Sequence, residues 1–202
     1  MTSPLITPPE YDDKPEPPAG RRALDVFLEL AQTLLLAAAL FLAVNVVSAR
    51  IRVEGPSMEY SLLDGEVVIV NRLAYRWDEP DRGDIIVFYY PLDPDRRLIK
   101  RIIGLPGDEI QVAGSDIYVN GIRLDETYLS LPPAENHGDP ATAVTWTLDE
   151  GQVFVMGDNR DHSSDSRHWG PLPEEDIIGK AVFVYWPINQ IGPIPHVDIT
   201  LP

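Results

Sequence analysis

Hydrophobic and polar positions divide the chain into three stretches. Residues 1–22 are rich in proline and acidic groups and show no hydrophobic period. Such a segment cannot bury enough apolar surface to offset the entropy of ordering it, so we expect a disordered tail. Residues 23–49 are almost entirely Leu, Ala and Val, and from residue 50 short apolar runs alternate with polar residues. The pattern predicts a tail, one long helix and a strand-rich domain of residues 50–202.

The apolar stretch 23–49 predicts a transmembrane helix. From Leu30 onward it carries no charge for about twenty residues, roughly 30 Å of helix, which is enough to cross the hydrocarbon core of a bilayer. A buried soluble helix would show a polar stripe along its whole length, whereas Asp25, Glu29 and Gln32 occupy only the first turns. A cleaved secretory signal would have a shorter apolar region and a basic leader rather than an acidic one. We therefore expect a permanent anchor.

The orientation of this anchor is not set by nearby charge. Arg21 and Arg22 precede the apolar stretch, and Arg50 and Arg52 follow it, so the positive charges nearly balance. Long following domains are translocated largely regardless of charge. We expect a single-pass protein of the cytoplasmic membrane with its domain on the extracytoplasmic side.

The remainder of the chain reads as a mostly β domain. Its short apolar runs are rich in Val, Ile and aromatic residues and are separated by Gly, Pro, Asn and Asp. They are EVVIV, DIIVFYY, RLIKRIIG, DIYVN, IRL, VTWTL, QVFVM and AVFVYWP. Asn120-Gly121 suits a type I′ turn between two short strands. Residues 129–142 are expected to form a long loop.

Composition excludes several classes of function. The formal net charge of −16 and the pI near 4.4 argue against binding to nucleic acid, which requires an excess of Lys and Arg on some face. The absence of cysteine excludes a disulfide framework and a zinc-thiolate site. The histidines show no spacing typical of a metal site; they are His137, His162, His168 and His196. We expect no nucleic-acid partner, no cofactor and no metal.

Two residues could form a catalytic pair, although each has an ordinary structural interpretation. Ser57 lies in a Gly-Pro-Ser stretch, which turns favour for backbone reasons alone. In RLIKRII a strand would place Leu98, Lys100 and Ile102 on one face, and an exposed lysine beside apolar residues is common. If Lys100 were buried, desolvation would lower its pKa, and the neutral amine could act as general base for a serine hydroxyl.

A third unusual stretch is VFVMGDNRDHSSDSRHWGPLP, residues 153–173. Its composition is typical of an exposed, turn-rich loop. It could instead form a hydrogen-bonded wall in which Asp and Arg side chains pair and a hydroxyl holds the amine of Lys100 toward Ser57.

Taken in order, the anchor, GPSM, RGDIIVF, LIKRIIGLPGDEI and MGDNRDHSSDSRHWG resemble the bacterial type I signal peptidases, which are membrane-anchored Ser/Lys leader peptidases. The resemblance covers residues 23–187. It implies a mostly β fold, with an N-terminal transmembrane helix followed by a catalytic domain of coiled antiparallel sheets and an inserted β-ribbon region. In this reading residues 50–202 form the catalytic domain, and residues from about 111 to 152 form a variable β insertion.

The resemblance also implies roles for individual residues. Ser57 corresponds to the nucleophile, Lys100 to the general base and Ser163 to the hydroxyl that positions the lysine. The backbone N–H of Ser57 would bind the oxyanion. The supporting polar network would consist of Asp158, Arg160, Asp165 and Arg167.

The implied function is that of a membrane-bound endopeptidase that removes N-terminal signal peptides from exported preproteins through an acyl-enzyme. The implied partners are preprotein signal peptides and membrane lipid, and the implied location is near the secretion translocon. No cofactor is implied.

The chain departs from the family pattern at two places. Tyr60-Ser61 stands where the family commonly has Pro-Thr; Ser61 keeps a hydroxyl, but Tyr60 frees a backbone angle and adds a bulky ring. Gly55 stands where some members carry a serine that donates to the oxyanion, so the hole would depend on backbone N–H groups. The alternative function is therefore a catalytically impaired, membrane-anchored paralogue that acts as a binding or scaffold protein. A self-cleaving repressor with Ser/Lys chemistry would need a DNA-binding head and no anchor.

Overall fold

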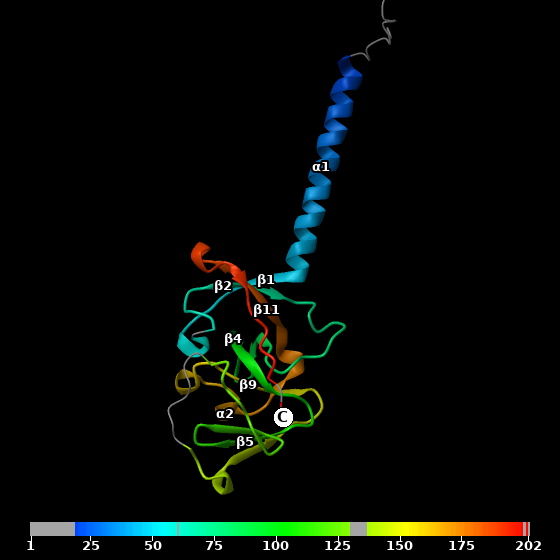
Figure 1. The fold of residues 1–202 in the computed structure, drawn as a ribbon. Helices are drawn as coiled ribbons and strands as arrows, with labels where there is room; N and C mark the ends of the chain where they lie inside the picture. The colour runs from blue at the N-terminus through cyan, green and yellow to red at the C-terminus, as the bar shows by residue number, and fades with distance from the viewer. Residues whose placement is uncertain (1–18, 60, 130–136, 200, 202) are drawn as a thin grey trace, which may run out of the picture. The chain divides into compact units, whose positions relative to one another are not determined.

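A computed structural model of the chain describes residues 19–59, 61–129, 137–199 and 201. Most of the expected tail, Tyr60 and half of the expected loop at residues 129–142 lie outside the described residues. The chain forms two compact units, one ending at Val44 and the other spanning Asn45–Pro202 (Figure 1), and each is described by itself.

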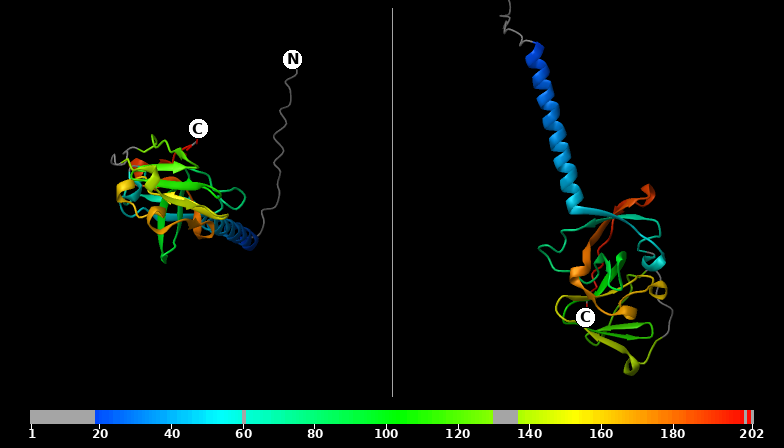
Figure 2. Two further views of the ribbon diagram at one scale, coloured as in Figure 1. Left: turned by 90° about the horizontal axis from the view of Figure 1, so that it is seen from below. Right: turned by 180° about the vertical axis from the view of Figure 1, so that it is seen from behind.

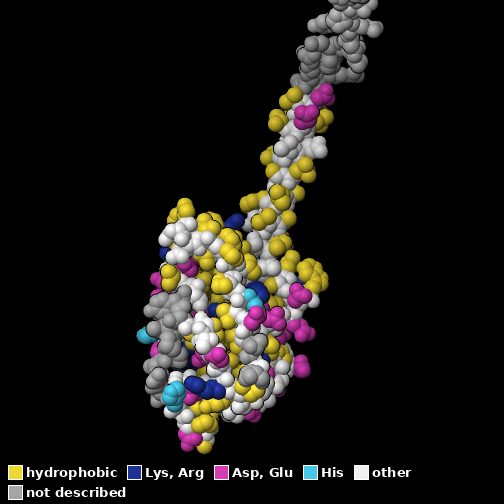
Figure 3. All heavy atoms as spheres, in the orientation of Figure 1, with side chains coloured by type: hydrophobic (Ala, Val, Ile, Leu, Met, Phe, Trp, Pro, Cys, Tyr) yellow, Lys and Arg dark blue, Asp and Glu magenta, His cyan; other side chains and the backbone are white. Residues whose placement is uncertain are grey.

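The first unit is built on the helix α1 (Ala19–Val47). Its segment Asp25–Val47 is long and apolar enough to cross a membrane, and the side chains of this segment are exposed. Hydrophobic side chains lie along the length of the helix, and acidic side chains lie near its N-terminal end (Figure 3). The helix ends before the expected boundary because Ser48 and Ala49 pair with Asn71 and Val70 as part of a strand.

The second unit contains two antiparallel sheets, which can be followed in two further views (Figure 2). The larger sheet has the order β1-β2-β11-β3-β4-β9-β10, and β12 pairs with β11. Its strands are β1 (Ser48–Arg52), β2 (Val67–Asn71), β3 (Ile85–Tyr90), β4 (Asp93–Gly104), β9 (Gln152–Met156), β10 (Leu172–Pro173), β11 (Ile177–Trp186) and β12 (Gly192–Pro193).

The smaller sheet has the order β7-β6-β5-β8. Its strands are β5 (Glu109–Ala113), β6 (Asp116–Val119), β7 (Ile122–Arg123) and β8 (Val144–Thr147). Short helices connect the strands: η1 (Pro56–Met58), η2 (Pro140–Thr142), η3 (Arg160–His162), α2 (Ser166–Trp169), η4 (Glu174–Asp176) and η5 (Ile188–Gln190). The prediction of a mostly β domain of antiparallel sheets after one apolar helix is confirmed.

The predicted hairpin is confirmed in detail. Val119 pairs with Ile122 across the turn, and Asn120 and Gly121 both have positive φ, 54° and 77°, as a type I′ turn requires. The Asn120 side chain also accepts a hydrogen bond from the Glu109 N–H at 2.9 Å and donates one to Asp108 at 2.8 Å. This turn therefore holds the start of β5 as well as its own two strands.

The central strands are buried on both faces. Residues Ile85 to Phe88 of β3 are all at most 3% exposed, and they divide alternately between two hydrophobic clusters. The first cluster includes Val53, Met58, Leu62, Val68, Ile85, Val87 and Ile99. The other includes Ile86, Phe88, Ile102, Val153, Val155 and Leu172. Burial on both faces explains why β3 is a continuous apolar run rather than an alternating one, and why the second half of β4 is apolar except for Lys100 and Arg101.

β1 and the first part of β4 each leave a free edge in the larger sheet. In the part of the chain that the structure describes, β1 ends the sheet and pairs with β2 alone. β4 pairs with β3 from Asp93 to Arg101, whereas its described pairing with β9 begins only at Arg101. Among the described residues, the first part of β4 therefore has one edge without a strand partner.

Candidate active site

Ser57 lies in η1, which a short connection joins to the end of β1. Gly55 precedes it at φ 82°, and its N–H donates to Asp64 Oδ1 at 2.8 Å. The Ser57 carbonyl accepts a hydrogen bond from the Asn159 N–H at 3.1 Å. A Cβ at Gly157 would lie 2.4 Å from that carbonyl oxygen, so only glycine allows this close approach. The turn around Ser57 is thus held directly against the loop that follows β9.

Lys100 lies in β4 opposite Ile86 of β3, and it is 3% exposed. Its Nζ donates to Ser57 Oγ at 2.7 Å and to the Ile99 carbonyl at 2.9 Å. The structure therefore brings together the two residues that the sequence suggested as a pair. Of the two interpretations of Lys100, the buried one is confirmed and the exposed one is wrong.

Burial lowers the pKa of Lys100 to about 8, and the nearby positive charge of Arg167 acts in the same direction. The carboxylates of Asp165 and Asp158 oppose this shift because they favour the ammonium form. A substantial fraction of the amine is consequently neutral at mildly alkaline pH. A neutral amine 2.7 Å from a hydroxyl can accept its proton.

Asp165 is fully buried and lies at the centre of the loop after β9. Its carboxylate accepts hydrogen bonds from the Gly157 N–H at 3.0 Å and from Arg167 Nε and Nη2, each at 2.8 Å. Burial alone would raise its pKa, but the bonds and charge of Arg167 outweigh this effect and the pKa is lowered. The predicted pairing of Asp with Arg is present here.

Asp158 pairs with a residue that the sequence reasoning missed, Arg101. Arg101 is 2% exposed; its Nε and Nη2 donate to the two carboxylate oxygens of Asp158 at 2.8 and 2.6 Å. Its Nη1 donates to the Gly83 carbonyl at 2.7 Å, and its Nη2 reaches Ser61 Oγ at 3.4 Å. The sequence does contain a signal for Arg101, because it is a second charged residue, next to Lys100, in an otherwise apolar run. Ser61, one of the two departures from the family pattern, thus keeps a contact for its hydroxyl.

Arg160 also has a partner outside its own loop. Its Nε donates to Glu126 Oε1 at 2.9 Å, its Nη2 to the Tyr128 hydroxyl at 2.6 Å and its Nη1 to the Gly157 carbonyl at 2.7 Å. Burial raises the pKa of Tyr128 to about 12, so its hydroxyl stays protonated. Glu126 and Tyr128 lie between β7 and β8, so the segment that follows β7 is attached to the loop beside Ser57.

Ser163 lies close to the pair, but its predicted contact is not among the hydrogen bonds of the described residues. Its hydroxyl is buried, and a Cβ at Gly157 would lie 2.3 Å from it. It is near enough to Asp165 to help lower the pKa of that carboxyl, yet within the described residues it makes no hydrogen bond of ordinary geometry. The positioning role of Ser163 stays a prediction.

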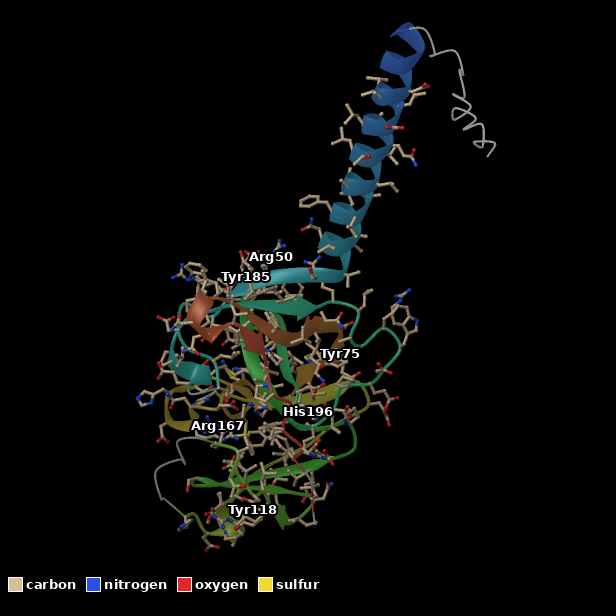
Figure 4. The ribbon with its side chains drawn as sticks, turned by 45° about the horizontal axis from the view of Figure 1, so that its top comes forward. Arg50, Tyr75, Tyr118, Arg167, Tyr185 and His196 are labelled. Atoms are coloured by element: carbon tan, nitrogen blue, oxygen red, sulfur yellow. The ribbon has the colours of Figure 1, made fainter. Side chains whose placement is uncertain are left out.

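A cleft of about 430 Å³ opens beside Ser57 and Lys100. One wall of the cleft is formed by β1 and Glu54, and the other wall by the first part of β4. The cleft therefore lies between the free edges of these two strands. Besides the pair, its lining consists of Arg50, Ile51, Arg52, Glu54, Asp95, Arg96, Arg97, Leu98 and Ile99. Arg50 extends from β1 at the same end of the domain as Tyr185 (Figure 4). Within the described part of the chain, no group of three or more His, Asp and Glu side chains is arranged to hold a metal ion.

Comparisons with known proteins agree in naming one family. A family model described as signal peptidase, peptidase S26, matches residues 27–186. A probable signal peptidase I-2 of Synechocystis sp. is 37% identical over 175 residues, which cover 83% of this chain and 77% of that protein. A signal peptidase I of Leptolyngbya laminosa is 33% identical over 202 residues, 95% of this chain and 96% of that protein. A crystal structure of a signal peptidase I from Enterococcus faecalis is 34% identical, covers 51% of this chain and 97% of that chain, and has a TM-score of 0.43.

Proposed function

Because this chain belongs to the signal peptidase family, peptidase S26, we propose that it removes signal peptides from exported preproteins and that Ser57 and Lys100 perform the cleavage. The observation that carries this proposal is the 2.7 Å contact between Lys100 Nζ and Ser57 Oγ, made by a buried lysine whose pKa is lowered to about 8. The alternative, an impaired paralogue acting as a scaffold, is motivated by Tyr60, and a scaffold would have no use for a buried lysine held against a serine hydroxyl. The intact pair favours catalysis.

The reaction begins with a proton transfer from Ser57 Oγ to the neutral Nζ of Lys100 as Oγ attacks the scissile carbonyl carbon. The backbone N–H of Ser57 stabilises the oxyanion that forms. The lysine ammonium then protonates the leaving amine, and the C–N bond breaks to give an acyl-enzyme. Water repeats the sequence, with Lys100 accepting its proton, and releases the signal peptide. The bond from Nζ to the Ile99 carbonyl keeps the amine oriented throughout.

The substrate binds as an extended strand in the cleft between β1 and β4. Both strands offer free backbone groups there, and an added strand can hydrogen-bond to both edges. Ile99 forms the apolar floor of the cleft next to the pair, and it belongs to the first hydrophobic cluster together with Val53, Met58 and Leu62; all four are between 0 and 6% exposed. A floor packed in this way would accept small substrate side chains only.

We further propose that the domain lies on the extracytoplasmic side of the cytoplasmic membrane, in contact with lipid and near the secretion translocon. The apolar segment Asp25–Val47 supports membrane insertion. The side follows from the proposed reaction, because the signal peptide of an exported preprotein is cut on the extracytoplasmic side.

Protease added outside spheroplasts should therefore digest residues beyond Ser48 and leave the N-terminal tail protected. Antibodies against tags at the two ends of the chain would follow the two regions. Protection of the C-terminal tag until the cells are lysed would reverse the orientation. A mature N-terminus at Arg50 would show instead that the helix is removed.

The role of Lys100 makes a sharp prediction. Lys100→Arg should be nearly inactive, because a guanidinium with pKa above about 12 cannot accept the serine proton. Ser57→Ala should be equally inactive, and the double variant little worse than either, since the two groups act as a unit. The wild-type kcat/KM should rise with pH through an apparent pKa of about 8, because the amine acts in its neutral form, which is lost as pH falls below that value.

Cleavage of a purified preprotein by the detergent-solubilised full chain measures these rates. Lys180→Arg is the matched control, since Lys180 is also a strand lysine but pairs with Asp84 at 2.5 Å instead of contacting Ser57. Substantial activity in Lys100→Arg would refute the general-base role.

Ser163 is proposed to position the Lys100 amine. Ser163→Ala should lower kcat by roughly 10- to 1000-fold, because a positioning hydrogen bond is worth a few kcal/mol at most in the transition state. The apparent pKa of Lys100 in the pH dependence of kcat/KM should shift as well, and a loss of packing alone would not cause this shift. Ser164→Ala serves as control because Ser164 is exposed. An unchanged profile in Ser163→Ala would remove this residue from the mechanism.

Small residues are expected immediately before the cut and two positions earlier. A bulky side chain there would clash with the packed floor or force it to rearrange, so we expect a loss of about 100-fold or more in kcat/KM. A preprotein series with Ala, Val and Phe at each position measures this loss. Efficient cleavage after Phe would contradict the proposed floor.

A further inference from the structure

The cleft beside Ser57 has a charge opposite to that of the protein. Four arginines line it, Arg50, Arg52, Arg96 and Arg97, whereas the whole chain carries a formal net charge of −16. Two carboxylates, those of Glu54 and Asp95, line the same cleft, so arginines exceed carboxylates there by four to two. An acidic protein therefore presents a locally cationic surface where its substrate would bind.

These arginines differ from most other cations of the domain in having no acidic partner. Six other cations lie within 4.0 Å of a carboxylate: Arg82, Arg101, Arg123, Arg160, Arg167 and Lys180. Within the part of the chain that the structure describes, none of the four cleft arginines forms such a pair, and all four are exposed. Arg96 only lies over the Tyr90 ring, 5.8 Å from its centroid. Their charge is available to an anionic group that arrives from outside.

Three of the four share one face of the sheet. On β1, Ile51 packs against the first hydrophobic cluster, so its neighbours Arg50 and Arg52 face the opposite side. On β4, Ile99 belongs to the same cluster whereas Leu98 packs against the other one, so Leu98 faces away from the first cluster. Arg96 is two positions before Leu98, in the part of β4 where the register with β3 shifts, and we place it on the face of Leu98 by alternation. An extended peptide between β1 and β4 would place every second side chain between these arginines.

The directions of β1 and β4 indicate which substrate residue would place its side chain between these arginines. The successive antiparallel pairs from β1 through β2, β11 and β3 to β4 make β1 and β4 parallel, and both run toward the Ser57–Lys100 pair. Residues before the cut also run toward the pair, so they fill the cleft when the substrate lies parallel to both strands, which is the orientation we propose. If the first and third residues before the cut face the hydrophobic floor, the second and fourth face the arginines. Arg96 precedes Lys100 by four strand positions, about 13 Å, which favours the fourth residue.

Building on the proposed function, we propose that Arg50, Arg52 and Arg96 form a specificity subsite that prefers an acidic side chain four residues before the cleavage site. A carboxylate there gains charge-assisted hydrogen bonds, whereas a lysine meets three like charges. The energetic effect is that of partly exposed ion pairs, so it decreases with ionic strength.

The test uses the full-length protein in a neutral detergent and peptides that keep Ala at the first and third positions before the cut. The fourth position carries Glu, Gln or Lys, and a second series carries the same residues at the fifth. We expect kcat/KM to be about ten-fold higher for Glu than for Lys at the fourth position, and about equal at the fifth. Arg96→Gln and Arg50→Gln should each reduce the Glu-to-Lys ratio to about three-fold or less, as should about 0.5 M salt. Arg76→Gln, an exposed arginine outside the cleft, should leave the ratio unchanged.

Cleavage of the Gln peptide by the wild-type protein reports the proposed function separately, and its absence would refute that function. If the Gln peptide is cleaved but Glu and Lys peptides react equally, the acidic subsite is overturned. A Glu-to-Lys ratio that survives in the Arg50 and Arg96 variants would overturn it too. An effect of these variants that appears only after phosphatidylglycerol is added would assign the arginines to lipid instead, and would likewise overturn the proposal.

Discussion

A primary amine held out of water beside a serine hydroxyl is the interaction on which the domain's architecture depends. Lowering the pKa of Lys100 from 10.5 to about 8 corresponds to a cost of about 3 kcal/mol for keeping the ammonium form buried. The cost is offset by the packing of β3, β4 and β9, whose apolar residues form a hydrophobic cluster on each face of the sheet. The same burial would be ineffective if the nearby acids were unpaired, because Asp165 and Asp158 both favour the charged amine. Arg167 holds the first and Arg101 the second, so each pairing reduces the pull on Lys100.

The smaller sheet contributes to this arrangement from a distance. Glu126 and Tyr128 bind Arg160, whose guanidinium also donates to the Gly157 carbonyl within the loop that packs against Ser57. Arg82 joins the turn before β3 to Asp108 at 2.9 Å, and Asp108 in turn accepts from Asn120 of the β6–β7 turn. Both links join the two sheets through buried or half-buried charge pairs. A change in the smaller sheet can thus reach Ser57 through hydrogen bonds that have defined geometry, even though none of its strands contributes to the cleft.

The free edges of β1 and β4 can bind an extended substrate, but they also expose the protein to pairing with other copies of itself. A free edge can pair with the edge of another molecule, and proteins commonly discourage such pairing by placing charged side chains there. The arginines on β1 and β4 fit this role, since two copies of the cleft would repel each other. A peptide with small side chains on one face and a carboxylate on the other would meet neither the steric nor the electrostatic barrier. The edges can therefore remain open to one class of extended segment while excluding others.

The chain's local patterns determined the helix and most of the strands, because burial on one or both faces leaves a periodic trace in a few neighbouring residues. Four strands were missed: β1, whose first residues continue the apolar stretch of α1, β5, which has only two large apolar residues in EIQVA, and the two-residue strands β10 and β12. Residue types also indicated Ser57 and Lys100, through motifs that resemble those of a known family. The partners of the charged residues were decided only by tertiary structure. Asp158 and Arg160 are near neighbours in sequence, yet Asp158 pairs with Arg101 and Arg160 with Glu126, 57 and 34 positions away. Such pairs depend on sheet register and strand order, which bring distant segments together and leave no mark in the spacing of either segment alone.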